Sequence, residues 1–161
     1  MLHIKPIILS LMILMVLPLS SHAEMDINKA LSHGETVYVP IYSNVHAGPK
    51  ARPFLLSAML SIRNTDPKNK ISVSLADYHD TNGTIIESYI KKPVILKPLS
   101  STFIYIKERD IRGGPGASFI VKWHSDKWVN QPIIEGVMLG LTSGQGVSFI
   151  CPGQILVEGK N

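Results

Sequence analysis

Residues 54–63 read FLLSAMLSIR, and the alternation in this stretch decides the fold class. Every second position carries an apolar side chain, namely Phe54, Leu56, Ala58, Leu60 and Ile62. Three of the five positions between them are small or charged: Ser57, Ser61 and Arg63. Successive side chains of a β-strand point to opposite faces, so this period of two predicts a strand with one buried face.

The residues that follow turn the chain back on itself. Residues 64–69, Asn-Thr-Asp-Pro-Lys-Asn, are turn formers, and alternation resumes with Ile71, Val73 and Leu75 on the inward side. Residues 80–83, Asp-Thr-Asn-Gly, then close a hairpin to a strand at 84–89. Three antiparallel strands joined by tight turns are therefore predicted.

Shorter runs of the same kind occur along the rest of the chain. They predict further strands at 36–42, 94–96, 102–106, 117–123, 133–141, 147–150 and 155–157. Pro40 indicates an edge strand for the first of these, because proline cannot donate to a sheet. The run 133–141 also fits a helical stripe, but its short length and the flanking Pro132 and Gly140 favour a strand.

This pattern predicts an all-β, immunoglobulin-like antiparallel sandwich of about eight strands. A small closed β-barrel is the alternative. Trp123 suits the buried aromatic position of a sandwich core, where its indole N–H requires a hydrogen-bond partner.

The N-terminal segment has the three parts of an export signal. Lys5 supplies the positive region, residues 7–19 are almost entirely apolar, and Ser21-His22-Ala23 forms a small-x-small cleavage site. Because crossing a bilayer takes about 20 apolar residues, the run is too short for an anchor. We therefore predict a signal peptide at 1–23 and a periplasmic or extracellular protein with no membrane span after cleavage.

The remaining residues form one domain in this interpretation. Residues 24–35 are polar and weakly patterned, so they are expected to be a flexible lead-in, with a short helix over 27–31 as the alternative. The sandwich is expected to span residues 36–158, followed by a C-terminal tail at 159–161.

Charge and cysteine content exclude two classes of protein. The chain has 16 basic and 12 acidic side chains, a net charge of +4, and the basic residues are scattered. A nucleic-acid-binding protein normally gathers them on one face, so no nucleic-acid partner is predicted. Cys151 is the single cysteine, which rules out an intramolecular disulfide, and its apolar context indicates a buried, inert thiol.

Four motifs give the chain a resemblance to a known family. They are Ser61-Ile62-Arg63-Asn64-Thr65-Asp66, Asp77-Tyr78-His79-Asp80 with Gly83, Gly113-Gly114-Pro115-Gly116-Ala117, and Ser143-Gly144-Gln145-Gly146. Together they resemble an uncharacterised bacterial family, domain of unknown function 3124, over residue 37 to about 155. The resemblance implies a small exported bacterial protein with no assigned activity and no known catalytic residues.

Two motifs contain residue types that could carry chemistry. Asp77, His79 and Asp80 could bind a metal or relay a proton, yet Asp80 begins a turn, where its side chain normally caps the backbone. Residues 113–116 lack the following helix and Lys-Ser or Lys-Thr of a phosphate loop, so a tight turn is favoured. Neither motif predicts a catalytic residue, and no cofactor is expected.

The candidate ligand-binding residues are polar or aromatic positions in or near loops: Tyr42, Arg52, Asp77, His79, Glu135 and Gln145. If the fold gathers them, Arg52 could pair with an anionic group while Tyr42 and Trp128 supply contact area. We therefore expect a non-enzymatic binding or assembly module of the bacterial cell envelope, with an envelope protein or a small ligand as partner.

The alternative function is a periplasmic copper- or zinc-binding or redox protein. It would use His46, His79, His124 or Cys151, although the chain lacks the close Cys-His-Met loop of copper electron-transfer proteins. A hydrolase ranks last, because no local imidazole or oxyanion donor accompanies a nucleophile.

Overall fold

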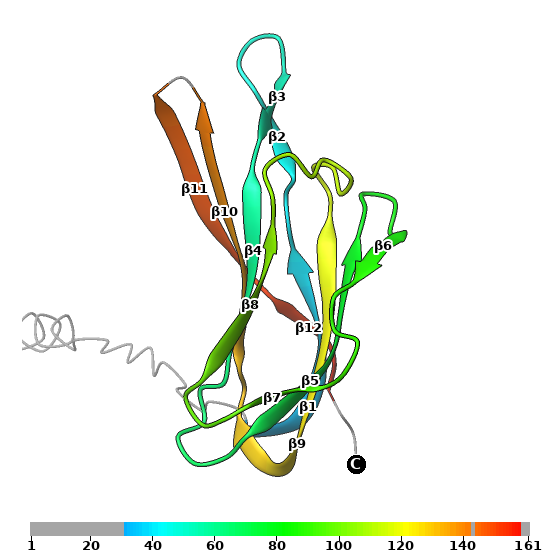
Figure 1. The fold of residues 1–161 in the computed structure, drawn as a ribbon, viewed down its shortest axis with the longest axis vertical. Coiled ribbons are helices and arrows are strands. Elements are labelled where there is room, and N and C mark those ends of the chain that lie inside the picture. Colours follow the sequence, from blue (N-terminus) through cyan, green and yellow to red (C-terminus); the bar gives the residue numbers. More distant parts are fainter. Residues whose placement is uncertain (1–30, 143, 159–161) are drawn as a thin grey trace, which may run out of the picture.

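The computed structural model describes residues 31–142 and 144–158 (Figure 1). This part of the chain is all-β, with no helix, and its two main antiparallel sheets pack face to face without closing into a barrel. The predicted fold class, an antiparallel β-sandwich, is confirmed. The predicted signal peptide at 1–23, residues 24–30 and the tail at 159–161 lie outside the described residues. The described residues include no helix that could cross a bilayer.

The larger sheet has six strands, and its first strand is longer than the sequence pattern indicates. In spatial order its strands are β12 (Gln154–Glu158), β1 (Leu31–Pro40), β9 (Ser118–Asn130), β5 (Ile71–His79) and β6 (Ile85–Ser88), with β7 (Val94–Leu96) also paired to β5. β1 begins at Leu31, so the last five residues of the expected lead-in belong to the sheet.

The expectation that Pro40 marks an edge strand is wrong. β1 lies between β12 and β9 and pairs with both. Pro40 is tolerated because it is the last residue of the strand, and the pairing of β1 with β12 has already ended at Tyr38. No partner on that side requires the N–H that proline lacks.

The smaller sheet has four strands. In spatial order these are β11 (Gln145–Pro152), β10 (Ile133–Thr142), β4 (Ser57–Arg63) and β8 (Ser101–Ile106), and a separate hairpin joins β2 (Asn44–Ala47) to β3 (Arg52–Leu55). The described residues thus hold twelve strands rather than about eight. The stretch that predicted the fold divides at Leu56 between β3 and β4, and residues 133–141 are strand, as expected.

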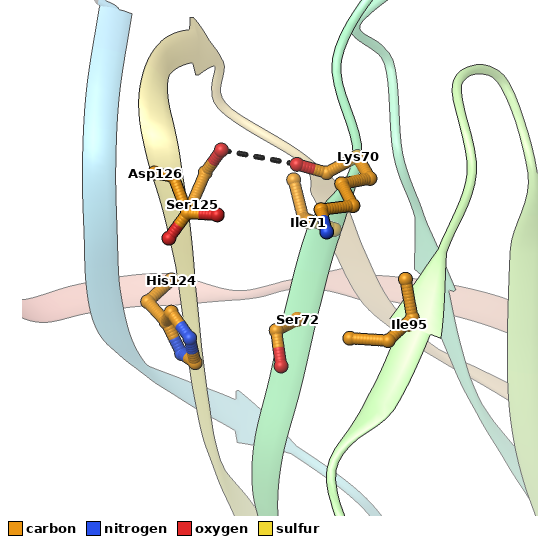
Figure 2. A pocket seen from close by; sticks show the side chains of 7 residues that line it. All are labelled: Lys70, Ile71, Ser72, Ile95, His124, Ser125 and Asp126. Atoms are coloured by element: carbon orange, nitrogen blue, oxygen red, sulfur yellow. Dashed lines mark hydrogen bonds between the residues drawn. The ribbon is translucent and has the colours of Figure 1, made fainter.

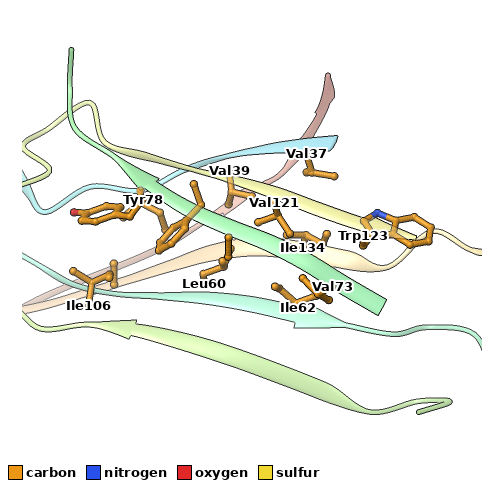
Figure 3. Packing of buried hydrophobic residues seen from close by; sticks show 14 of the residues in the cluster. Val37, Val39, Leu60, Ile62, Val73, Tyr78, Ile106, Val121, Trp123 and Ile134 are labelled. Carbon is orange, nitrogen blue, oxygen red and sulfur yellow. The ribbon is translucent and has the colours of Figure 1, made fainter. Parts of the chain in front are cut away.

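The core lies between the two sheets (Figure 3). Leu56, Ala58, Leu60 and Ile62 are all buried there, as the alternation predicts. Trp123 is also buried, at 3% exposure, but within the described part of the chain its Nε1 has no hydrogen-bond partner. The core therefore contains one unsatisfied donor, a group that normally finds an acceptor when buried.

The two sheets meet most closely where the chain passes from one to the other. It leaves β11 at Pro152 and enters β12 at Gln154, and between them Gly153 donates its N–H to the carbonyl of Ile134 at 2.8 Å. A Cβ atom on Gly136 would lie 2.7 Å from the Pro40 carbonyl oxygen and 2.7 Å from Ile41 Cδ1. Only a residue without a side chain fits between these strands.

Asn64 directly follows β4 and holds together one end of the sandwich. It is 2% exposed, and its Nδ2 donates to three backbone carbonyls at 2.9, 3.2 and 3.0 Å, those of Asn69, Leu96 and Lys97. The sequence predicts only a turn here. The structure shows a buried amide that joins the β4–β5 loop to β7.

Asp66 anchors the same end through its carboxylate. The oxygens accept the backbone N–H groups of Lys68 at 2.9 Å, Asn69 at 2.7 Å and Asn130 at 3.2 Å. Burial alone would raise the pKa of Asp66, but these hydrogen bonds and one from the Asn69 side chain outweigh it, so the pKa lies below its ordinary 3.8. The ionised form of Asp66 therefore stabilises the fold.

Candidate functional site

The predicted Asp77–His79–Asp80 group lies at the end of β5, and its main contacts are structural. His79 Nδ1 lies 3.1 Å from the backbone carbonyl oxygen of Asp77. Asp80 Oδ1 accepts the N–H groups of Asn82 and Thr84, both at 2.8 Å. Asp80 thus closes the hairpin turn in the way that its position in the sequence predicts.

The other predicted site residues lie on separate elements. Tyr42 follows β1 and packs against Phe149, with ring centroids 5.6 Å apart. Arg52 begins β3 and is exposed, Glu135 lies on β10, and Gln145 begins β11, where only its backbone is described. Within the described side chains, the recorded contacts bring together only Asp77 and His79 from this set.

The glycine-rich loop at 113–116 is a turn that locks onto the β5–β6 hairpin. The Thr81 hydroxyl donates to the Gly113 carbonyl at 2.9 Å and accepts the Gly116 N–H at 3.1 Å. A Cβ on Gly113 would lie 2.0 Å from the Tyr78 hydroxyl, which pairs with Ser43 Oγ at 2.9 Å in the interior. Two of the sequence motifs thus meet as one packed unit.

The candidate metal ligands are spread over the molecule. His46 is exposed on β2, His124 is exposed on β9, and Cys151 is half-buried on β11. Burial raises the pKa of the Cys151 thiol, which disfavours the thiolate that a metal would need. Within residues 31–142 and 144–158, no three His, Cys, Asp or Glu side chains lie close enough to hold a metal ion.

A small pocket opens beside His124 (Figure 2). It has a volume of about 90 Å³ and is lined by Lys70, Ile71, Ser72, Ile95, His124, Ser125 and Asp126. Ser125 Oγ donates to the Lys70 carbonyl at 3.0 Å across its rim. Since one water takes up about 30 Å³, the space holds only a few waters.

A larger pocket of about 240 Å³ lies where β1, β10 and β12 converge. Its polar lining is Glu35, Gln131 and Glu135, and its other walls are apolar or glycine: Val37, Pro132, Ile133, Ile134, Pro152, Gly153 and Ile155. Glu35 is only 5% exposed, and its Oε1 accepts a 2.6 Å hydrogen bond from Gln131 Nε2. A buried carboxylate therefore lies at the wall of a pocket.

Sequence reasoning missed Glu35 because it places residues 24–35 in a flexible lead-in. The register shows Glu35 opposite Trp123 on β9, and Val37 opposite Val121, so Glu35 faces the interior in phase with the core side chains of β1. The signal was available, since Glu35 precedes Val37 and Val39 at the same spacing of two. A charged residue in a core position is a mark of a possible functional site.

The four-stranded sheet has an outer face that is turned away from the six-stranded sheet (Figure 1). The exposed side chains on this outer face are mostly apolar. Paired residues form one row across all four strands: Ile150, Val137, Met59 and Tyr105. Ile150 is 59% exposed and Tyr105 is 55% exposed. Neighbouring rows add further exposed apolar side chains, Phe103, Ile133, Leu139 and Leu141.

One pair of charges interrupts this outer face. Arg63 Nε lies 3.9 Å from Glu135 Oε1, and the Arg63 side chain is half-exposed. Apolar side chains scattered singly over a surface are ordinary, but a contiguous patch that crosses a whole sheet is typical of an interaction surface. The described part of the chain leaves this patch open.

Comparison with known proteins identifies the family and no activity. No curated protein matches the chain. A solved structure, the crystal structure of Thermotoga maritima 1070, aligns with a TM-score of 0.47 and 11% identity over 74% of this chain and 92% of that one, and no argument about function follows from it. Residues 34–156 match the family described as protein of unknown function (DUF3124). The chain therefore belongs to the DUF3124 family.

Proposed function

We propose that the protein is a non-enzymatic assembly module of the bacterial cell envelope, exported by its N-terminal segment. The signal-like pattern of residues 1–23 supports export. The observation that carries the assembly role is the apolar outer face of the four-stranded sheet, with its row from Ile150 to Tyr105. Burial of this face against a partner would remove its apolar side chains from water.

The partner whose chemistry fits this face is a second copy of the chain. In a two-fold symmetric contact the same patch serves both subunits, so each residue on it must find its complement on that patch. The outer face meets this condition, because its described strand positions carry one cation, Arg63, and one anion, Glu135, among neutral side chains. Each copy can then place its Arg63 against the Glu135 of the other.

Charge-reversal variants test this contact, and sedimentation velocity over a concentration series measures it. Arg63→Glu makes the two charges on the face negative, and Glu135→Arg makes both positive. We expect the wild type to form a dimer at micromolar concentration, and each variant alone to remain monomeric because like charges across an interface repel. An equimolar mixture of the two variants should form a heterodimer, which an ion pair within one chain could not produce.

An apolar residue on the other sheet provides the control. Tyr105→Lys should abolish the dimer, whereas Ile85→Lys should leave it intact, since Ile85 is equally exposed at 55% but lies on β6. A wild-type chain that stays monomeric at hundreds of micromolar would refute self-assembly. Export has its own test: fractionation of cells that express the full chain should recover it outside the cytoplasm, with a new N-terminus after Ala23.

A further inference from the structure

Glu35 is a buried anion without a cation in the described part of the chain. The ion pairs recorded there join Arg63 to Glu135 and Arg112 to Glu87 and Asp110, and Gln131, its hydrogen-bond donor, is neutral. Buried carboxylates are normally paired with a cation or with several donors, because removal of the charge from water is costly. With one hydrogen bond recorded, the Glu35 carboxylate keeps acceptor capacity at the pocket, and neither of its oxygens is among the fully buried, unpartnered atoms of the described residues.

The pocket beside Glu35 supplies room for the missing positive charge. Its volume of about 240 Å³ is below the usual range for drug-sized ligands, so it suits a side chain or a small amine rather than a cofactor. The same pocket is lined by polar groups and by the apolar side chains of Val37, Ile134 and Ile155. Figure 3 shows Val37 and Ile134 with Trp123 toward one end of the core.

The donor set favours an organic cation over a metal ion. Ca²⁺ takes six to eight oxygen ligands, whereas the described lining has two carboxylates, of which Glu135 already faces Arg63. An alkylammonium group needs only a few acceptors, and Glu35 and the Gln131 amide oxygen supply them. Its methylene groups can lie along the apolar walls, as the stem of a lysine does on protein surfaces.

We propose that this pocket binds the alkylammonium group of a ligand, with Glu35 as the counter-ion and Gln131 holding the carboxylate in place. The inference rests on an interior carboxylate and not on the assembly proposed for the outer face, with which the pocket shares Ile133 and Glu135. The ammonium can come from a free amine or from a lysine side chain in a peptide.

Tryptophan emission and thermal unfolding test the proposal on the full chain. The chain has two tryptophans, and Trp128→Phe leaves Trp123, which is opposite Glu35, as the single emitter. The probes are n-butylammonium for the free source, Nα-acetyl-lysine amide for the peptide source, and 1-butanol as the neutral control. We expect both ammonium probes to give a saturable change in emission at millimolar concentration and to raise the Tm, and 1-butanol to do neither.

The Glu35→Gln variant separates binding from structure. It keeps an oxygen for the Gln131 hydrogen bond but removes the charge, so we expect roughly 30-fold weaker ammonium binding, together with a Tm without ligand that is unchanged or raised. Asp126→Asn, at an exposed carboxylate elsewhere, should bind like the wild type. A preference for the lysine amide would identify a peptide ligand, and a preference for n-butylammonium a free amine.

Three outcomes would overturn the proposal. The first is no saturable response to either ammonium probe up to tens of millimolar. The second is equal binding by Glu35→Gln. The third is a combination of two results. The Tm of Glu35→Gln without ligand is lower than that of the wild type, and CaCl₂, rather than either ammonium probe, produces the change in emission. Because Glu135 and Arg63 remain unchanged throughout, the residues proposed to pair in the dimer are the same in every chain compared.

Discussion

Replacement of Asp66 by alanine is expected to lower the free energy of unfolding by about 3 to 4 kcal/mol. The substitution removes the acceptor of the backbone N–H groups of Lys68, Asn69 and Asn130. Hydrogen bonds to a charged group contribute about 1.5 to 3 kcal/mol each, and the total is discounted here because water can reach the exposed end of this loop. Chemical denaturation of both chains at neutral pH gives the difference.

The exposed carboxylate of Asp126 provides the matched control. Asp126→Ala is expected to change the free energy of unfolding by less than about 0.5 kcal/mol, since no hydrogen bond to this side chain is recorded within the described residues. A loss below about 1 kcal/mol for Asp66→Ala would contradict the role assigned to this carboxylate.

Asp66 should also give the stability a characteristic dependence on pH. Its pKa in the folded state is lower than the ordinary 3.8, so its contribution is fully present above pH 3.8 and is lost as the pH falls through the lower, folded value. The free energy of unfolding, measured by chemical denaturation at several pH values from neutral to strongly acidic, should therefore fall less steeply with decreasing pH for Asp66→Asn than for the wild type. The same pH dependence in both chains would show that Asp66 is not ionised preferentially in the folded chain.

Replacement of Gly136 by alanine is expected to cost about 3 kcal/mol, the upper part of the range for overpacked interiors. The added Cβ would lie 2.7 Å from the Pro40 carbonyl oxygen and 2.7 Å from Ile41 Cδ1. The isoleucine can move, but the carbonyl belongs to Pro40 of β1, which is still paired with β9 at Ser118. The sheets must separate locally to admit the methyl group.

Gly146 serves as the control for this substitution, because it lies on the paired strand β11. A Cβ there would lie 3.2 Å from the flexible end of Leu141, and the nearest backbone atom, the Gly140 carbonyl oxygen, would be 4.0 Å away. Gly146→Ala should therefore change the midpoint of thermal unfolding by little, while Gly136→Ala lowers it by roughly 10 °C. Equal effects at the two glycines would mean that backbone contact at Gly136 does not limit the packing.

The sandwich could be predicted from the sequence because its strands alternate. Leu56, Ala58, Leu60 and Ile62 share a face whatever partners the strand has, so the local pattern is enough. The strands that pair with one another can be far apart in the sequence, so the local pattern does not reveal which strands pair. Taken alone, Pro40 indicates an edge strand, yet it lies at the end of a strand that has a neighbour on both sides. The position of β12 beside β1 has no signature in either segment.

The candidate sites were harder to predict than the fold. The turn role of Asp80 follows from neighbours in the chain, and the structure confirms it. The partnership of Glu35 with Gln131 spans 96 residues, so it depends on how β1 pairs with β9. The apolar outer face likewise requires the order of the strands, which the sequence leaves open.

The pairing of β1 with β12 also constrains when the fold can form. Glu35 lies opposite Glu158, so the first described strand completes its ladder only with the last one. A chain that emerges gradually from the ribosome, or passes through a membrane channel from its N-terminus, lacks that final strand until almost all of it has arrived. Such long-range closure slows folding and favours an unfolded chain during transit.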